Sequence, residues 1–129
     1  SLTRSSRLPM LAAMRAIASA TGAVLATRIE RADRFWPRLR GLLGRARFEP
    51  GEGLLLVPCA SIHTLGMRFP IDALFLDAGG TVLHAIRALA PWRLAPPIRG
   101  ARMVLELPAG TLARCGTGAG SVVRFERPS

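Results

Sequence analysis

The polar residues best suited to chemistry gather in one short stretch of the chain: Cys59, Ser61, His63, Thr64, Arg68 and Asp72. Apolar runs flank this stretch, so we expect a loop between two strands, and loops on a rigid scaffold commonly carry sites. A nucleophilic hydrolase or transferase needs a thiol, an imidazole that takes its proton and a carboxylate that fixes the imidazole tautomer. Cys59, His63 and Asp72 are therefore candidate catalytic residues. Their spacing matches no catalytic signature, and the alternative is a packed thiol, with the other two side chains bonded to loop backbone.

A metal site is a second interpretation of these residues. The donors would be Cys59, His63, His84 and Cys115, a set that suits tetrahedral zinc. The sequence lacks the closely spaced Cys-x-x-Cys and His-x-x-x-His pairs of structural zinc sites. His84 alternates with Val82 and Ile86, which indicates a place on a half-buried strand face. We therefore expect neither a metal nor another cofactor.

Ligand binding is the third interpretation, and the one that we favour. The candidate ligand-binding residues are His63, Thr64, Met67, Arg68, Asp72, Trp92 and Arg93. Arginine can donate to an anionic group and tryptophan can stack on a ligand. A small β-domain with a polar loop and no clear catalytic set is typically a binder. We expect a small-ligand-binding or interaction module with its site in residues 59–72, and a small molecule or a protein as its partner. The alternative is a Cys/His-dependent hydrolase or transferase.

The basic residues are the most unusual feature of the composition. All 18 are arginines, and the chain has a formal net charge of +10 with no lysine, asparagine, glutamine or tyrosine. The absence of lysine excludes a Schiff-base nucleophile and a P-loop lysine. Residues 1–47 hold ten arginines and only two acids. Non-specific nucleic-acid binding is a further alternative, through Arg28, Arg31, Arg34, Arg38, Arg40, Arg45 and Arg47, whereas a solvated basic face is the simpler explanation.

The beginning of the chain allows two interpretations. Arg4 and Arg7 precede an apolar run, and residues 18–20 have the small-x-small spacing of a signal-peptidase site, which would mean export. Against this, Arg15 interrupts the apolar run, and no stretch of the chain is long enough to span a bilayer. A Thr-Gly pair at 21–22 instead suits a turn between two strands, and we favour this second interpretation.

The expected organisation is therefore a loose extension over residues 1–13 and a single β-rich domain over residues 14–129. Two cysteines make no disulfide framework. We expect reduced thiols and a cytoplasmic protein, with export as the alternative, and a monomer or a small homo-oligomer.

The elements that must position these residues are mostly short strands. Apolar runs and turn signals predict strands over residues 15–20, 23–30, 54–57, 71–76, 81–89, 101–107 and 121–126, a helix over 35–45 and one helical turn over 112–114. The strands follow one another too closely for repeated βαβ crossovers. The predicted fold is mainly β: a compact sandwich or partly closed barrel of about seven or eight short strands with one short helix.

Three stretches together carry a family resemblance. They are Arg-Leu-Arg-Gly-Leu-Leu-Gly-Arg at 38–45, the sequence from Cys59 to Asp77, and Val-Leu-Glu-Leu-Pro-Ala-Gly at 104–110. Their order and spacing resemble the bacterial and archaeal family known as domain of unknown function 192. The resemblance implies a compact β-rich fold and brings no activity, ligand or catalytic residue. Many members have a Trp-Met-Lys-Asn-Thr-like stretch where this chain has residues 62–67, so the chain is similar to a Ser-Ile-His-Thr variant.

Overall fold

The computed structural model describes residues 14–32 and 47–127. The predicted helix over 35–45 and the predicted extension over 1–13 lie outside this part of the chain. Within it the strands are β1 (Met14–Ala18), β2 (Val24–Ala32), β3 (Glu52–Leu56), β4 (Ile62–His63), β5 (Ile71–Leu76), β6 (Val82–Leu89), β7 (Leu94–Ala95), β8 (Met103–Pro108) and β9 (Val123–Glu126), with the helix α3 (Thr111–Cys115). The prediction of a mainly β fold is confirmed.

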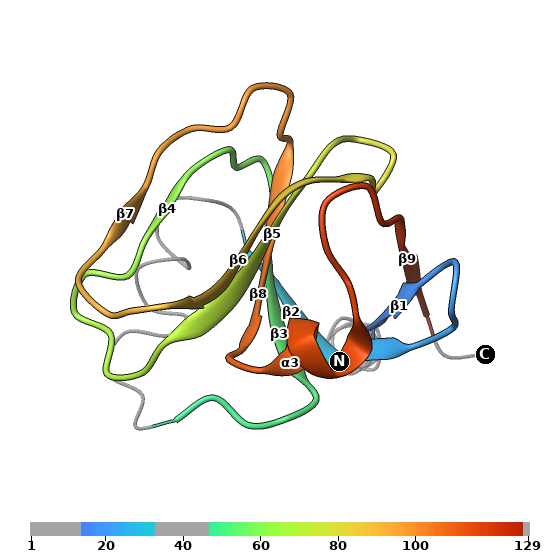
Figure 1. Cartoon of the computed structure of the whole chain (residues 1–129), viewed down its shortest axis with the longest axis horizontal. Helices are drawn as coiled ribbons and strands as arrows, with labels where there is room; N and C mark the ends of the chain where they lie inside the picture. The colour runs from blue at the N-terminus through green and yellow to red at the C-terminus, as the bar shows by residue number, and fades with distance from the viewer. Residues whose placement is uncertain (1–13, 33–46, 128–129) are drawn as a thin grey trace, which may run out of the picture.

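Seven strands form one curled sheet in the order β6-β5-β8-β3-β2-β1-β9 (Figure 1). Only β2 and β3 run parallel; the other neighbouring pairs are antiparallel. A bridge between Thr81 and Val122 brings the start of β6 against the start of β9, and the Val123 N–H donates to the Gly80 carbonyl oxygen at 2.8 Å. The sheet thus closes at one corner, which makes the fold a partly closed barrel.

A glycine is required at that corner. Gly80 has φ of 90°, and a Cβ atom there would lie 2.4 Å from the carbonyl oxygen of Val123. The turn over residues 77–80 therefore also allows the two ends of the sheet to approach.

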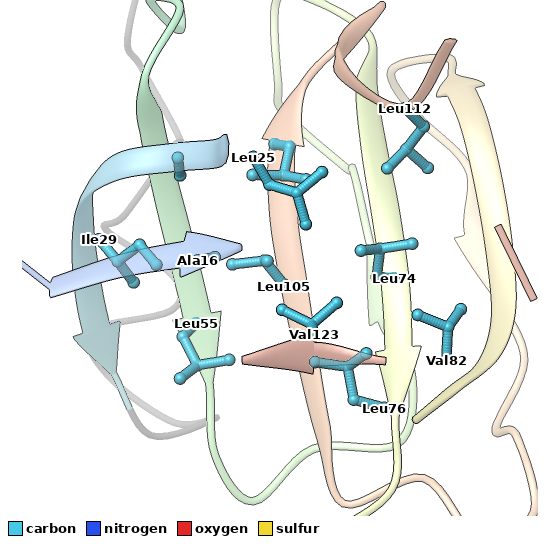
Figure 2. Packing of buried hydrophobic residues seen from close by; sticks show 12 residues of the cluster. Ala16, Leu25, Ile29, Leu55, Leu74, Leu76, Val82, Leu105, Leu112 and Val123 are labelled. Carbon is cyan, nitrogen blue, oxygen red and sulfur yellow. The ribbon is translucent and has the colours of Figure 1, made fainter. Parts of the chain in front are cut away.

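The central strands are buried on both faces, and their side chains alternate between two cores. On the concave face, Leu55, Leu74 and Leu105 pack with residues from both ends of the sheet, among them Val82 and Val123 (Figure 2). On the opposite face, the core includes Leu54, Leu56, Ile71, Ala73, Phe75 and Val104. A strand buried on both faces carries a nearly continuous apolar run, which explains why the run at 71–76 predicts β5.

A two-stranded sheet covers the second core. β4 and β7 pair antiparallel, with Ile62 opposite Ala95 and His63 opposite Leu94. Backbone hydrogen bonds extend the pairing, from the Cys59 N–H to the Arg102 oxygen and from the Ile98 N–H to the Ala60 oxygen, both at 3.0 Å. We call the paired segments 57–70 and 90–102 the ribbon; β4 and β7 lie side by side on the left of Figure 1.

Candidate functional site

Asp72 belongs to the core of the sheet. Its side chain is fully buried, one carboxylate oxygen accepts the Ala88 N–H at 2.8 Å, and the other accepts the Leu112 N–H at 2.9 Å. Ala88 has a left-handed backbone with φ of 52°, and Leu112 lies in the first turn of α3, which has no side-chain cap of its own. The carboxylate therefore fastens β6 and α3 to β5, and it does not orient the imidazole of His63.

The other two candidate catalytic residues bond to nearby backbone. Cys59 is 4% exposed within the second core, and its thiol donates to the carbonyl oxygen of Ser61 at 3.0 Å. His63 is half-buried, and its Nδ1 accepts the N–H of Leu65 at 3.2 Å. The carboxylate of Asp72 thus bonds to backbone N–H groups, not to His63 as the catalytic interpretation requires.

The four candidate metal donors are distributed over the ribbon, β6 and α3. Cys59 and His63 belong to the ribbon, His84 lies on β6 with its ring 5.8 Å from that of Phe75, and the Cys115 thiol in α3 lies 3.6 Å from the Val24 oxygen. Neither cysteine forms a disulfide. Across residues 14–32 and 47–127, no group of three or more His, Cys, Asp or Glu residues is placed to hold a metal ion.

Thr64 is fully buried and fixes the turn at the end of the ribbon. Its hydroxyl donates to the Ala90 oxygen at 2.7 Å and accepts the Arg93 N–H at 2.9 Å. Its backbone N–H donates to the Arg93 oxygen, and its own carbonyl oxygen accepts the Trp92 N–H, both at 2.9 Å. One threonine thus bonds to three residues of the turn that carries Trp92.

Trp92 is the most unusual residue of this turn. Its φ is 63°, a left-handed conformation that is a genuine outlier for a bulky side chain. The residue is 64% exposed. A strained conformation of this kind costs about 1–3 kcal/mol and persists only where the surroundings enforce it. The hydrogen bonds of Thr64 hold the backbone of the turn in this conformation, which leaves a large aromatic side chain in solvent.

The outer side of the ribbon is apolar and basic. Along β4 and β7, the inward residues Ile62 and Ala95 are buried, whereas Leu94 is 71% exposed and Leu65 beyond β4 is 40% exposed. We call the set of His63, Leu65, Arg68, Trp92, Arg93 and Leu94 the ribbon surface. Four of the predicted ligand-binding residues belong to it (His63, Arg68, Trp92 and Arg93), whereas Thr64, Met67 and Asp72 are buried.

Two residues of the ribbon surface were not among the residues predicted from the sequence to bind a ligand. Leu65 and Leu94 are aliphatic, and an aliphatic residue in a loop carries no chemical signature. The available signal was their position in the sequence: Leu65 follows His63-Thr64 within the predicted site, and Leu94 follows Trp92-Arg93. Such residues can be identified as part of a candidate site only when the long-range pairing of strands shows which side of the chain faces solvent.

A hollow of about 270 Å³ lies elsewhere, where β5 begins and β8 ends. Its lining includes Phe48, Phe69, Pro70 and Pro108, and the two phenyl ring centroids are 6.0 Å apart. None of the predicted ligand-binding residues lines it. The hollow thus adjoins the end of the predicted loop, through Phe69 and Pro70, but not its candidate ligand-binding side chains.

The predicted nucleic-acid surface is only partly described. Arg28 and Arg31 are exposed on β2, and Arg47 pairs with Glu49 at 3.0 Å. Arg34, Arg38, Arg40 and Arg45 lie outside the described residues. In the two described segments, no helix is long and apolar enough to cross a membrane.

Comparisons with known proteins agree with the fold. The chain is 34% identical over 113 residues to a UPF0127 protein of Thermococcus sibiricus, covering 81% of this chain and 70% of the relative. It is 33% identical over 102 residues to a UPF0127 protein of Pyrococcus furiosus, covering 74% of this chain and 84% of the relative.

Two crystal structures resemble it with a TM-score of 0.73 each. One is a Sinorhizobium meliloti protein provisionally described as a transcription regulator, 25% identical, with coverage of 87% of this chain and 91% of that one. The other is a protein of unknown function from Novosphingobium aromaticivorans, 22% identical, with coverage of 86% and 82%. The model of the family DUF192, described as "Uncharacterized ACR", matches residues 16–125. The chain therefore belongs to the DUF192 family, whose function is unknown.

Proposed function

We propose that this protein is an interaction module that binds a polypeptide partner on its ribbon surface. The observation that carries the proposal is Trp92, which is held by Thr64 in a left-handed conformation with most of its side chain in solvent. Folding alone gains little from an exposed tryptophan on strained backbone. A binding role explains both features, because strain of this kind gathers at ligand clamps and switch regions.

The composition of the surface also supports this function. Tryptophan and arginine are the residues most enriched among those that dominate protein interfaces. Trp92 and Arg93 directly precede the exposed Leu94, and they bond to Thr64, the residue before the exposed Leu65. These hydrogen bonds fix the turn in advance. A surface ordered before binding loses less conformational entropy when a partner arrives.

A polypeptide fits better than a small molecule. Small-molecule sites are concave and enclose most of the ligand. Trp92 and Leu94 project from a two-stranded ribbon, and the hollow described above is lined by other residues. An extended or helical peptide can instead cover several exposed side chains at once.

Panning a random dodecapeptide phage library against the full chain tests the proposal. Enriched peptides are then synthesised and titrated against the parent chain, Trp92→Ala and Val122→Ala. Val122 serves as the control because it is also an exposed apolar residue, 41% exposed, but lies outside the ribbon surface, at the bridge to Thr81. We expect Trp92→Ala to weaken binding about thirtyfold, as for an interface hot spot, and Val122→Ala to leave it unchanged. Failure to enrich any peptide, or peptides that bind Trp92→Ala as tightly as the parent, would overturn the proposal.

A further inference from the structure

The charges of the ribbon point to the chemistry of the partner. Segments 57–70 and 90–102 contain four arginines and no aspartate or glutamate. The arginines are Arg68, Arg93, Arg99 and Arg102, and all four are exposed. Because the two segments are hydrogen-bonded from Cys59–Arg102 to Thr64–Arg93, these charges belong to one structural unit.

Three other exposed arginines are paired within the chain, whereas Arg28, Arg31, Arg87, Arg114 and Arg127 form no ion pair among the described residues. Arg15 and Arg124 both bond to Glu126, at 3.6 and 2.7 Å, and Arg47 bonds to Glu49. In the part of the chain that the structure describes, none of the four ribbon guanidinium groups forms an ion pair. The nearest carboxylate in sequence, Asp72, is buried with both oxygens bonded to backbone N–H groups.

We propose that the polypeptide partner is acidic and carries apolar side chains; this inference rests on the proposed function. Its carboxylates pair with Arg68 and Arg93, because the planar guanidinium group matches a carboxylate with two parallel hydrogen bonds. Its aromatic or aliphatic side chains pack on Trp92 and Leu94. Charge complementarity of this kind raises the association rate and excludes basic partners.

Two other anionic partners fit the surface less well. A phosphate backbone is bound through cations, which gives the exposed Leu65 and Leu94 no role. A membrane would use the apolar groups, but even a whole myristoyl chain gives only marginal membrane binding. Three side chains, of which Leu65 is 40% exposed, offer too little area for stable insertion.

Random copolymers make the test independent of the natural partner. The full chain is immobilised and titrated with poly(Glu, Tyr), with poly-Glu, which lacks apolar side chains, and with poly(Lys, Tyr), which reverses the charge. We expect the order of affinity poly(Glu, Tyr), poly-Glu, poly(Lys, Tyr), with binding that weakens as salt screens the charges.

Variants locate the binding. We expect the double variant Arg68→Gln/Arg93→Gln to bind poly(Glu, Tyr) about tenfold more weakly, which corresponds to ~1.4 kcal/mol. The control Arg31→Gln/Arg114→Gln removes the same charge from exposed positions on β2 and α3, and we expect it to change affinity less than about twofold, since it leaves the ribbon intact.

The outcomes separate the two proposals. If library peptides depend on Trp92 but bind Arg68→Gln/Arg93→Gln normally, the interaction module stands and the acidic partner is overturned. If the two double variants, Arg68→Gln/Arg93→Gln and Arg31→Gln/Arg114→Gln, reduce copolymer binding equally, binding depends on net charge alone. The acidic-partner inference is then also overturned. If phosphatidylserine vesicles or single-stranded DNA bind more tightly than poly(Glu, Tyr), and lose affinity in the ribbon variants, the partner is a membrane or a nucleic acid and the inference is overturned.

Discussion

The hydroxyl oxygen of Thr64 accepts the backbone N–H of Arg93 at 2.9 Å, across a pair of segments 29 residues apart in the chain. The same hydroxyl donates to the carbonyl oxygen of Ala90. A single side-chain oxygen thus satisfies one donor and one acceptor of the turn that exposes Trp92. The order of the ribbon surface therefore depends on a fully buried residue.

Replacing Thr64 with valine keeps the shape of the side chain and removes both hydrogen bonds. Because a part-buried donor and a part-buried acceptor lose their partner, we expect Thr64→Val to lower the free energy of unfolding by about 2 kcal/mol, measured by urea denaturation. Amide exchange at Arg93 should also become faster. Peptides selected on the parent chain should bind more weakly, because the turn is no longer fixed.

Thr117→Val is the matched control. Thr117 is 1% exposed, and within the described residues its hydroxyl has no hydrogen-bond partner. Removing this hydroxyl should leave stability unchanged or raise it slightly, because an unpaired buried polar group is itself costly. Equal losses in the two variants would show that the hydrogen bonds of Thr64 contribute nothing specific.

Asp72 and Asp77 differ in how many oxygens they use. Asp72 uses both carboxylate oxygens, one for Ala88 and one for Leu112, whereas Oδ1 of Asp77 alone accepts the N–H groups of Gly79 and Thr81. Asparagine retains one carbonyl oxygen. We expect Asp72→Asn to lose one buried hydrogen bond and about 2 kcal/mol of stability, and Asp77→Asn to keep both bonds and stay within about 0.5 kcal/mol of the parent. Thermal and urea unfolding of the two variants measures this difference, and similar losses would contradict the structural role of Asp72.

The sequence predicts the large sheet well because its signals are local. The apolar run at 71–76 and the Asp-Ala-Gly-Gly turn after it predict β5 and the hairpin to β6, both of which the structure contains. A lone carboxylate within such a run, as at Asp72, is a sign of a buried residue with backbone partners. Asp72 nevertheless resembled a loop residue in the sequence, because the strand begins only one residue earlier, at Ile71.

The ribbon could not be predicted in the same way. β4 and β7 have two residues each, too few to show any periodicity. Their pairing depends on Ile62 and Ala95, which are buried against the second core although both lie in stretches that resemble loops. The left-handed backbone of Trp92 has no sequence signal either, since aromatic residues favour strands. The site thus emerges from long-range contacts rather than from any motif.

Gly80 is expected to be essential for closing the sheet. In Gly80→Ala, the new Cβ would meet the Val123 oxygen at 2.4 Å, so β6 and β9 must separate at their bridge. We expect a loss of about 3 kcal/mol or more, from strain and overpacking together. Gly110→Ala controls for backbone strain alone, because Gly110 has φ of 96° and a Cβ atom there would meet nothing within 4 Å beyond its chain neighbours; it should cost about 1–2 kcal/mol. If urea denaturation gives the same loss for both, the corner contact does not hold the sheet together.

Glycine at position 92 separates the requirements of folding from those of binding. Trp92→Gly removes the left-handed strain and a side chain that is mostly in solvent. The relief of about 1–2 kcal/mol exceeds or balances the extra backbone entropy of glycine, about 0.5–1 kcal/mol. We therefore expect Trp92→Gly to be at least as stable as the parent in urea denaturation.

Ala88→Gly is the companion variant, because Ala88 is the other non-glycine residue with a positive φ in residues 14–32 and 47–127. It should gain stability for the same reason and bind the selected peptides as the parent does. If the Trp92→Gly chain is stable but no longer binds the peptides, the tryptophan contributes to binding and not to folding stability. This is the result that a contact residue should give. A Trp92→Gly chain that is markedly destabilised would instead assign the tryptophan to packing, and the case for the ribbon surface would lose its main support.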